Sequence, residues 1–361
     1  MTPTNTIRSG LRALFKGFHQ KQVVTLTALV SGLWLQRRAG VAAIGRALRT
    51  RALPKHAIKR VDRFLGNPRF DELEGFRRLL RLAMRGRTRL FFALDWTTIR
   101  DHDVLVASLI HKGRALPVFW QVLDAATLYK SQNAFEHGFC AVLKTLLPAG
   151  CRAVLLADRG FMRVEFARFV QTLGFDFVVR ISGDVRLDHR DYRGPLSGLL
   201  TRRGQRLDLR GVQVRAHKAL TARIVGVWEP RQQEAWTLLT NLNFGVARLV
   251  KLYGARFQIE ESFRDQKSHR FGLSLGLLRM RQPRRLQRLL WVVVLLQWLA
   301  TLAGLEAVRR GWDRHYRANT VRDRPTHSYF QLGMHYLPRL PCSPWRLLPL
   351  LHASTPRILW G

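Results

Sequence analysis

Two stretches of similar design decide the fold: RLFFALD at residues 89–95 and CRAVLLAD at residues 151–158. In each, a run of strand-forming apolar residues leads directly to an aspartate. A short continuous apolar run is typical of a buried strand. We therefore expect two buried strands, with Asp95 and Asp158 at the points where these strands open to solvent.

The neighbouring segments give the order of elements. Three successive strands, joined as an antiparallel meander, are predicted by RLFFALDWTTI, DVLVASLIHKG and RALPVFWQVLDA. A helix at about 132–147, the strand CRAVLLAD, a helix at about 162–173 and the strand FDFVVRIS follow. This alternation predicts a mixed α/β core, which we place within residues 89–310.

The flanking regions differ from this core. Residues 1–88 carry helix-period apolar positions among many basic residues, with a break at Pro54 and a Gly-Asn-Pro turn at 66–68, and predict a small basic all-α domain. Short β-like runs at about 183–245 predict a β-rich insertion, and an amphipathic helix is expected from about 247. Residues 311–361 form a basic tail whose sequence leaves its structure open.

The composition points to a polyanionic partner. The 361 residues include 61 Lys and Arg against 24 Asp and Glu, a formal charge of +37. Such a surplus repels itself unless a polyanion is near, and the predominance of arginine favours bidentate contact with phosphate. Nucleic acid is the expected partner. On composition alone, a structural nucleic-acid-binding protein is an equal alternative.

Several other classes of protein are disfavoured. Three cysteines are too few for a disulfide framework, and none has zinc-ligand spacing. The N-terminus lacks the pattern of a secretory signal, so we expect a cytoplasmic protein. The apolar segment 289–305 includes Gln297 and is shorter than the roughly 20 residues that a bilayer core needs. A buried helix is expected there, with no membrane association.

The two aspartates suggest a metal site. If their strands are neighbours in one sheet, the carboxylates converge and repel each other unless a divalent cation lies between them. Mg²⁺ is the expected cation because it prefers oxygen ligands and leaves positions open for phosphate oxygens. The competing interpretation is that each aspartate only caps a turn or a helix.

A third acidic residue lies in YGARFQIEESFRDQK, residues 253–267. On a helix, Tyr253, Arg256, Glu260 and Lys267 fall within roughly 60° of arc, so one face carries all four. Arg264 extends the same stripe. The competing interpretation is an ordinary i,i+4 salt bridge between Glu260 and Arg256 or Arg264 on a solvated face.

This spacing resembles the Y-R-E-K motif of the insertion-sequence-four family of DDE-type bacterial transposases. Asp95 in LDWTTI and Asp158 in LADRGF resemble the two aspartate motifs of that family. The resemblance covers about residues 89–305. It implies a ribonuclease-H-like catalytic core in which the β-rich insertion separates the second acid from the third.

The resemblance also implies roles for these residues. Asp95, Asp158 and Glu260 would be both catalytic residues and ligands of two Mg²⁺ ions, for which Mn²⁺ could substitute. Tyr253, Arg256 and Lys267 would contact DNA phosphates, and we add Arg264 because it lies on the same stripe.

The expected activity is cleavage at transposon ends and strand transfer into target DNA. The implied partners are the terminal inverted repeats, target DNA and a second copy of the chain in the synaptic complex, with the basic tail as a candidate dimerisation segment. A non-catalytic DNA-binding protein and a ribonuclease-H-fold nuclease without strand transfer are the alternatives.

Other side chains were weighed for the same site. Asp101 and Asp103 are expected in the turn after the first strand and are less suited than Asp95 as the first acid. Glu136 is a candidate fourth carboxylate, although we favour a helix-surface position for it. Two tryptophans of the insertion, Trp228 and Trp236, are candidate platforms for a flipped base, but the core is the favoured place for both.

Overall fold

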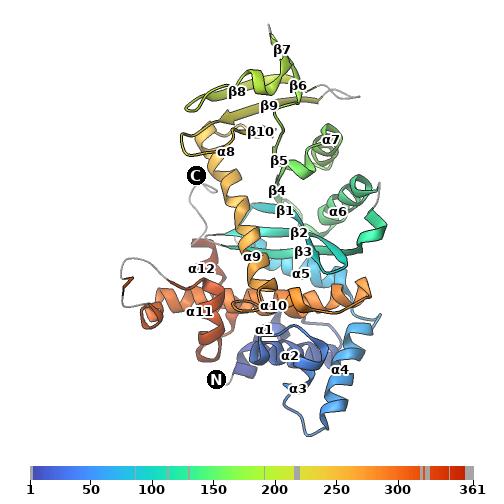
Figure 1. The fold of residues 1–361 in the computed structure, drawn as a ribbon. Coiled ribbons are helices and arrows are strands. Elements are labelled where there is room, and N and C mark those ends of the chain that lie inside the picture. The colour runs from blue at the N-terminus through green and yellow to red at the C-terminus, as the bar shows by residue number, and fades with distance from the viewer. Residues whose placement is uncertain are drawn as a thin grey trace.

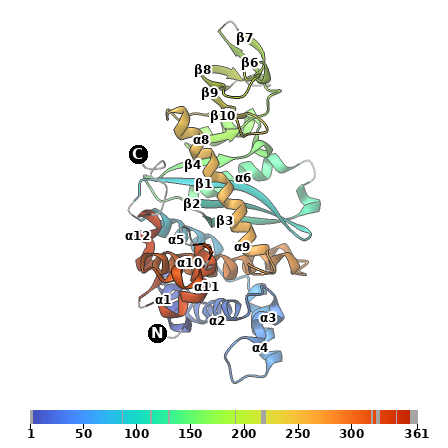
Figure 2. The same cartoon turned by 60° about the vertical axis from the view of Figure 1, so that its left-hand side comes forward.

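The computed structural model describes residues 3–85, 87–111, 114–128, 131–190, 192–214, 220–317, 320–321, 326–340 and 342–353. Its central feature is one mixed sheet, with helices on both faces and a helical layer below (Figures 1 and 2). The predicted mixed α/β class is therefore confirmed.

Ten described strands form this sheet, in the order β3-β2-β1-β4-β5-β10-β9-β8-β6-β7. Their bounds are β1 (Arg89–Ile99), β2 (His102–His111), β3 (Arg114–Asp124), β4 (Arg152–Ala157), β5 (Asp176–Arg180), β6 (Arg186–His189), β7 (Tyr192–Pro195), β8 (Arg206–Val214), β9 (Leu220–Val227) and β10 (Trp236–Thr240). The first three strands form the predicted antiparallel meander, while β4 runs parallel to both β1 and β5.

The β-rich insertion continues this sheet. Strand β10 pairs antiparallel with β5, and β9 and β8 follow outward from it. The hairpin of β6 and β7 then forms the far edge. Insertion and core therefore share one hydrogen-bonded ladder, which the run of short strands in the sequence did not reveal.

Helices lie on both faces of the sheet. On one side are α6 (Gln132–Leu146) and α7 (Val164–Thr172), close to the predicted bounds. On the other side α8 (Val246–Gly254) and α9 (Gln258–Lys267) form a long rod that crosses the strands (Figures 1 and 2). This rod carries the helical face that the sequence singles out.

The apolar segment near residue 295 is the helix α10 (Pro283–Arg309). This helix is long and apolar enough to cross a membrane, yet all of its most apolar window is buried inside the protein. The Trp298 indole donates to the carbonyl of Pro117 at 2.8 Å, and the Trp120 indole donates to that of Gln287 at 3.2 Å. The prediction of a buried helix is confirmed, and α10 lies against the sheet through β3.

The N-terminal helices lie on the other side of α10. They are α1 (Pro3–Leu14), α2 (Gln20–Gln36), α3 (Val41–Arg46), α4 (Pro54–Gly66) and α5 (Glu72–Met84). Pro54 occupies the first turn of α4, where no intrahelical N–H is needed, and Asp71 caps α5 by accepting from the N–H of Glu74 at 2.9 Å. The several short helices predicted for this region are confirmed.

The C-terminal tail also packs on α10. Its described part contains α11 (Tyr329–Tyr336) and α12 (Leu348–Ala353), while residues 354–361 lie outside the described part. Two glycines allow the close crossing of α10 and α11. A Cβ at Gly304 would overlap the backbone of Tyr329, and one at Gly333 would overlap the carbonyl of Ala300.

The change Gly333→Ala is therefore expected to lower the free energy of unfolding by about 1–3 kcal/mol, because the added methyl must push two helices apart. Urea denaturation of purified protein measures the effect. The matched control is Gly138→Ala on α6, where an added Cβ meets nothing within 4 Å and alanine is the better helix former. Equal midpoints for the two variants would show that the crossing is not tightly packed.

Candidate active site

Asp95 and Asp158 lie level with each other on neighbouring parallel strands. The pairing of β1 with β4 ends at Ala93 and Leu156, and each aspartate lies two residues further along its chain. Because side chains two positions apart point to the same face, both carboxylates project on one side of the sheet. The convergence expected from the sequence is present in the register.

The position of Asp95 within its strand differs from the expectation. Asp95 lies inside β1, which continues to Ile99 because β2 remains hydrogen-bonded beyond this point, with Asp95 opposite Val106. Only the pairing with β4 stops before it. Asp158 directly follows β4 as expected, and its carboxylate accepts from the N–H of Gly160 at 2.8 Å. Asp158 therefore also serves as the turn cap proposed as its competing role.

The third acid comes from the rod that crosses this face. Between α8 and α9 the chain forms one turn of 3₁₀ helix, Ala255–Phe257, so the rod is not the single α-helix that the spacing assumed. Tyr253 lies buried in the last turn of α8, and Arg256 lies in the 3₁₀ turn. Glu260 lies in α9 with 53% of its side chain exposed.

Arg256 joins the first and third acids. One guanidinium nitrogen lies 3.2 Å from Asp95 and the other 3.1 Å from Glu260, while only 5% of the arginine side chain is exposed. The guanidinium also lies 4.6 Å from the centre of the Phe257 ring. The sequence offered the Glu260 pair as a competing interpretation, but it gave no sign of Asp95, which is 161 positions away.

Electrostatic coupling extends to the remaining acid. Burial opposes the charge on Arg256, but its pKa is raised by Tyr253, Asp95, Asp158 and Glu260. One buried cation is therefore stabilised by the three carboxylates and the tyrosine together.

Comparison with known families bears on the identity of this arrangement. The family model described as the transposase DDE domain matches residues 118–299, just over half of the chain. This chain belongs to the transposase DDE domain family. Comparison with curated proteins gave no significant match. The matched segment includes Asp158 and Glu260 and begins after Asp95.

Burial makes the first acid of this transposase hard to ionise. The pKa of Asp95 is raised to about 6, chiefly by burial; Arg256 opposes the rise, and the carboxylates of Asp158 and Glu260 add to it. Burial lowers the pKa of Lys267, and Asp95 counteracts this. Asp95 is therefore coupled to Asp158, Glu260 and Lys267 at this site.

Divalent metal ions are generally used by transposase DDE domains. Among the described residues, no group of three or more His, Cys, Asp or Glu side chains is gathered closely enough to hold one, and the Arg256 guanidinium contacts both Asp95 and Glu260. The donor chemistry nevertheless fits Mg²⁺, because the three carboxylates supply only oxygen, and burial together with the charges of Asp158 and Glu260 raises the pKa of Asp95. A cation held by all three would require these side chains to draw together and Arg256 to release its contacts.

The two basic candidates nearest the end of the rod differ. Lys267 is half-buried, with its ammonium 5.7 Å from the centre of the Phe263 ring. Arg264 is 68% exposed and pairs with Glu261 at 2.9 Å. The structure therefore brings Lys267 to the acids and leaves Arg264 on the outer surface.

Glu136 was wrongly expected on a helix surface. Its side chain is fully buried and accepts from the Trp96 indole at 2.9 Å and from Gln132 at 2.8 Å. Arg163 from the start of α7 also pairs with it. These partners explain how a carboxylate is accommodated inside the protein, and two of them are remote in sequence.

The remaining candidates have ordinary positions. Asp103 lies in β2, not in the preceding turn, and accepts from Thr98 at 2.9 Å. Asp101 is exposed in the turn. Trp236 is half-buried, with its ring 5.6 Å from that of Phe257 and nearly parallel to it. The half-buried Trp228 donates to the carbonyl of Gln232 at 3.3 Å.

The raised pKa of Asp95 implies a pH-dependent effect on stability. In the unfolded chain an aspartate has a pKa near 3.9, so ionisation of Asp95 at higher pH opposes folding. Asp95→Asn is expected to stabilise the metal-free protein on the order of 2 kcal/mol above about pH 6. The gain should shrink as the pH falls toward about 4, where both forms become protonated.

Urea denaturation in the presence of a chelator, at several pH values, measures this difference. Glu165→Gln, at an exposed carboxylate on α7, is the control for loss of one negative charge. A stability gain for Asp95→Asn that is the same at low and neutral pH would contradict the assignment.

Proposed function

We propose that this transposase is of the insertion-sequence-four type, and that it cuts transposon ends and joins them to target DNA with Asp95, Asp158 and Glu260 as catalytic residues. The observation that carries the proposal is the convergence of acids from β1, the end of β4 and α9 around Arg256. A core of ribonuclease-H-like type agrees with the parallel pairing of β4 to β1 and with the large mixed sheet.

Asp95, Asp158 and Glu260 would hold two Mg²⁺ ions, with Mn²⁺ as a substitute. When bound, such ions supply an activated water or 3′-hydroxyl and neutralise the leaving oxygen of an in-line phosphoryl displacement. The same residues would serve cleavage and strand transfer, because the two reactions differ in the nucleophile.

Arg256 and Lys267 would hold the DNA backbone beside these acids. Arg256 contacts Asp95 and Glu260 in the absence of DNA, so a phosphate drawing its guanidinium away would free both carboxylates. Tyr253, buried under Trp236 with rings 5.2 Å apart, would fix the position of Arg256, while the exposed Arg264 would contact phosphates further along the DNA.

The parts of the chain would divide the work. Residues 1–88 would bind DNA, residues 89–310 with the β-rich insertion would carry out the chemistry, and residues 311–361 would contribute to a homodimer that pairs two transposon ends. The enzyme would act in the cytoplasm, on terminal inverted repeats and target DNA.

The first test is cleavage and joining of DNA carrying the ends of the element by purified protein with Mg²⁺. Asp95→Asn, Asp158→Asn and Glu260→Gln are each expected to reduce nicking by about 10³-fold or more, because each removes a ligand without changing the shape of the site. Glu261→Gln, one position away on α9, is the matched control and should keep activity. Metal-dependent binding without cleavage, or cleavage that survives Glu260→Gln, would refute the assignment. Nicking without joined products would favour a nuclease.

Arg256 provides a second test. Arg256→Lys keeps the positive charge but cannot span Asp95 and Glu260 with one planar group. Nicking is expected to fall about 10- to 100-fold, as for other residues that orient ligands. Wild-type nicking by this variant at saturating DNA would show that the bridge is dispensable. Arg203→Lys, at an exposed position of the insertion, serves as the control.

A further inference from the structure

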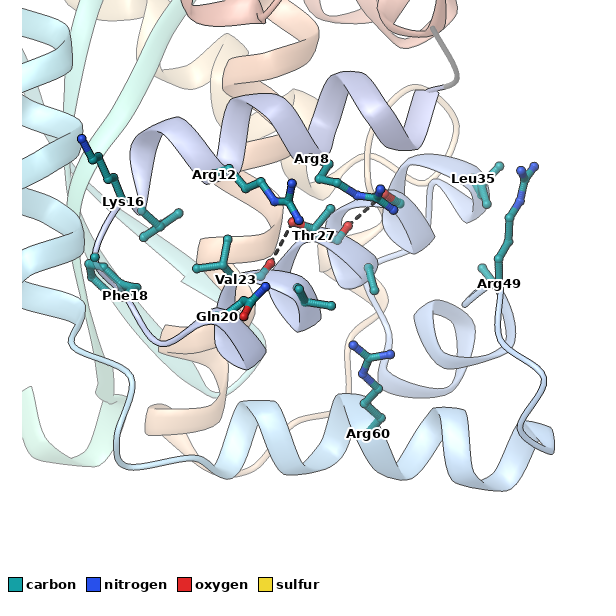
Figure 3. Close-up of a pocket in the computed structure, with 16 residues that line it drawn as sticks. Arg8, Arg12, Lys16, Phe18, Gln20, Val23, Thr27, Leu35, Arg49 and Arg60 are labelled. Carbon is teal, nitrogen blue, oxygen red and sulfur yellow. Dashed lines mark hydrogen bonds between the residues drawn. The ribbon is translucent and has the colours of Figure 1, made fainter.

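A groove on the N-terminal helices is lined by five basic side chains. Figure 3 shows Arg8 and Arg12 extending from α1 and Arg60 pointing from α4, with Lys16 and Arg49 toward the two ends. Arg8 and Arg12 are four residues apart and therefore lie on one face of α1. The groove lies on the far side of α10 from the sheet and its acids (Figures 1 and 2).

These five cations lack acidic partners. No aspartate or glutamate lines the groove, and within the described part of the chain none forms an ion pair with any of the five. Elsewhere in the same helices, arginines are paired, such as Arg78 with Glu74 at 2.7 Å. Gathered like charges repel one another, so the groove favours an anionic occupant with several charges.

The floor of the groove indicates that the bound molecule also has apolar surface. Val24 and Leu35 of α2 are 45% and 41% exposed, so the floor of the groove offers apolar surface to a bound molecule. The hydroxyls of Thr27 and Ser31 are bonded within α2, each to the carbonyl four residues before it at 2.8 Å. A cavity volume of about 540 Å³ is large enough for an organic ligand rather than a lone ion. A chain of phosphates with apolar sugar edges matches both the rim and the floor.

The groove is also held in shape. The turn between α1 and α2 is fixed by Arg78, which donates to the carbonyl of Lys16, and by Gly17 at φ +91°. Arg60 donates to Thr25 at 3.1 Å. On the other wall, α3 and α4 approach so closely that a Cβ at Gly45 would lie 2.6 Å from the Cα of Ile58. Little ordering of the protein is therefore required on binding.

We infer that this groove binds the sugar–phosphate backbone of one strand of duplex DNA, away from the scissile phosphate. The inference rests on the proposed function in that the DNA is taken to be the transposase substrate. It assigns contacts with DNA far from the scissile phosphate to Arg8, Arg12 and Arg60. These contacts are separate from those made beside the acids. Backbone contacts of this kind position a duplex without reading its sequence.

The test measures binding of a fluorescein-labelled duplex of mixed sequence to the full chain over a range of salt concentrations. Each lost phosphate contact reduces the slope of log affinity against log salt by about 0.9. The triple variant Arg8→Gln, Arg12→Gln, Arg60→Gln is expected to lose about 2 to 3 units of slope. The control triple Arg202→Gln, Arg203→Gln, Arg231→Gln removes the same charge from exposed positions of the insertion and should change the slope by less than about 1 unit.

Two further variants separate the groove from a folding defect. The triple change of Arg8, Arg12 and Arg60 to Lys keeps the charges and should keep most of the slope. Val24→Glu places a carboxylate on the exposed floor, where folding tolerates it, and should weaken binding to the same duplex. An unchanged slope in the Gln triple variant, or an equal loss in the control triple, would overturn the inference.

These experiments distinguish failure of the groove inference from failure of the proposed function. Asp158→Asn should abolish nicking of element-end DNA and leave the salt slope intact, whereas the groove variant should lose slope and need a higher DNA concentration for half-maximal nicking. A wild-type protein that binds with the expected slope but never nicks would overturn the proposed function and leave the groove standing.

Discussion

The burial of α10 is the constraint on which the rest of the structure depends. This helix presents apolar residues all round, so every face must be covered by another part of the chain. The sheet, the N-terminal helices and α11 each cover one side, and Trp120, Trp298 and Gln287 fix the contact with β3. On the opposite side, Arg288 pairs with Glu72 at 3.2 Å and donates to the carbonyl of Leu65, which ties α10 to α4 and α5. Three segments far apart in sequence therefore have fixed positions, because each must cover one apolar face of α10.

The active site depends on a different kind of constraint. Register fixes Asp95 and Asp158 relative to each other, whereas Glu260 reaches them only through the path of the α8–α9 rod. Burial and the neighbouring carboxylates of Asp158 and Glu260 both disfavour the charged form of Asp95, and its raised pKa records that cost. Arg256 compensates for it in the protein alone. The site therefore favours a positive charge among its carboxylates, and the Arg256 guanidinium supplies that charge.

Much of this arrangement could be predicted from the sequence, because it depends on local pattern. The strand that carries Asp95, the strand that leads to Asp158, the helices α6 and α7, and the buried α10 all follow from apolar periodicity. The features that the sequence did not predict share one cause, because each depends on contacts between residues remote in sequence. Glu136 is buried because Trp96 and Arg163 satisfy it, β1 extends past Asp95 because β2 remains paired, and Arg256 bridges to Asp95 across the fold. The groove cations were missed for the same reason, since Arg8 of α1, Arg49 after α3 and Arg60 of α4 line one groove only when these segments pack together. The roles of the site residues in catalysis stay predictions.

The position of α10 late in the chain also bears on how the protein is made. Synthesis proceeds from the N-terminus, and the helices α1–α5 emerge long before residues 283–309 that cover their apolar side. Until then their inner faces are only partly covered: Phe76, for example, packs against Phe119 and Trp120 of β3 and, in the finished protein, lies 4.6 Å from the Trp291 ring. Chains of this kind are slow to mature and prone to association while incomplete. A nascent polypeptide would therefore acquire its finished N-terminal region only near the end of translation.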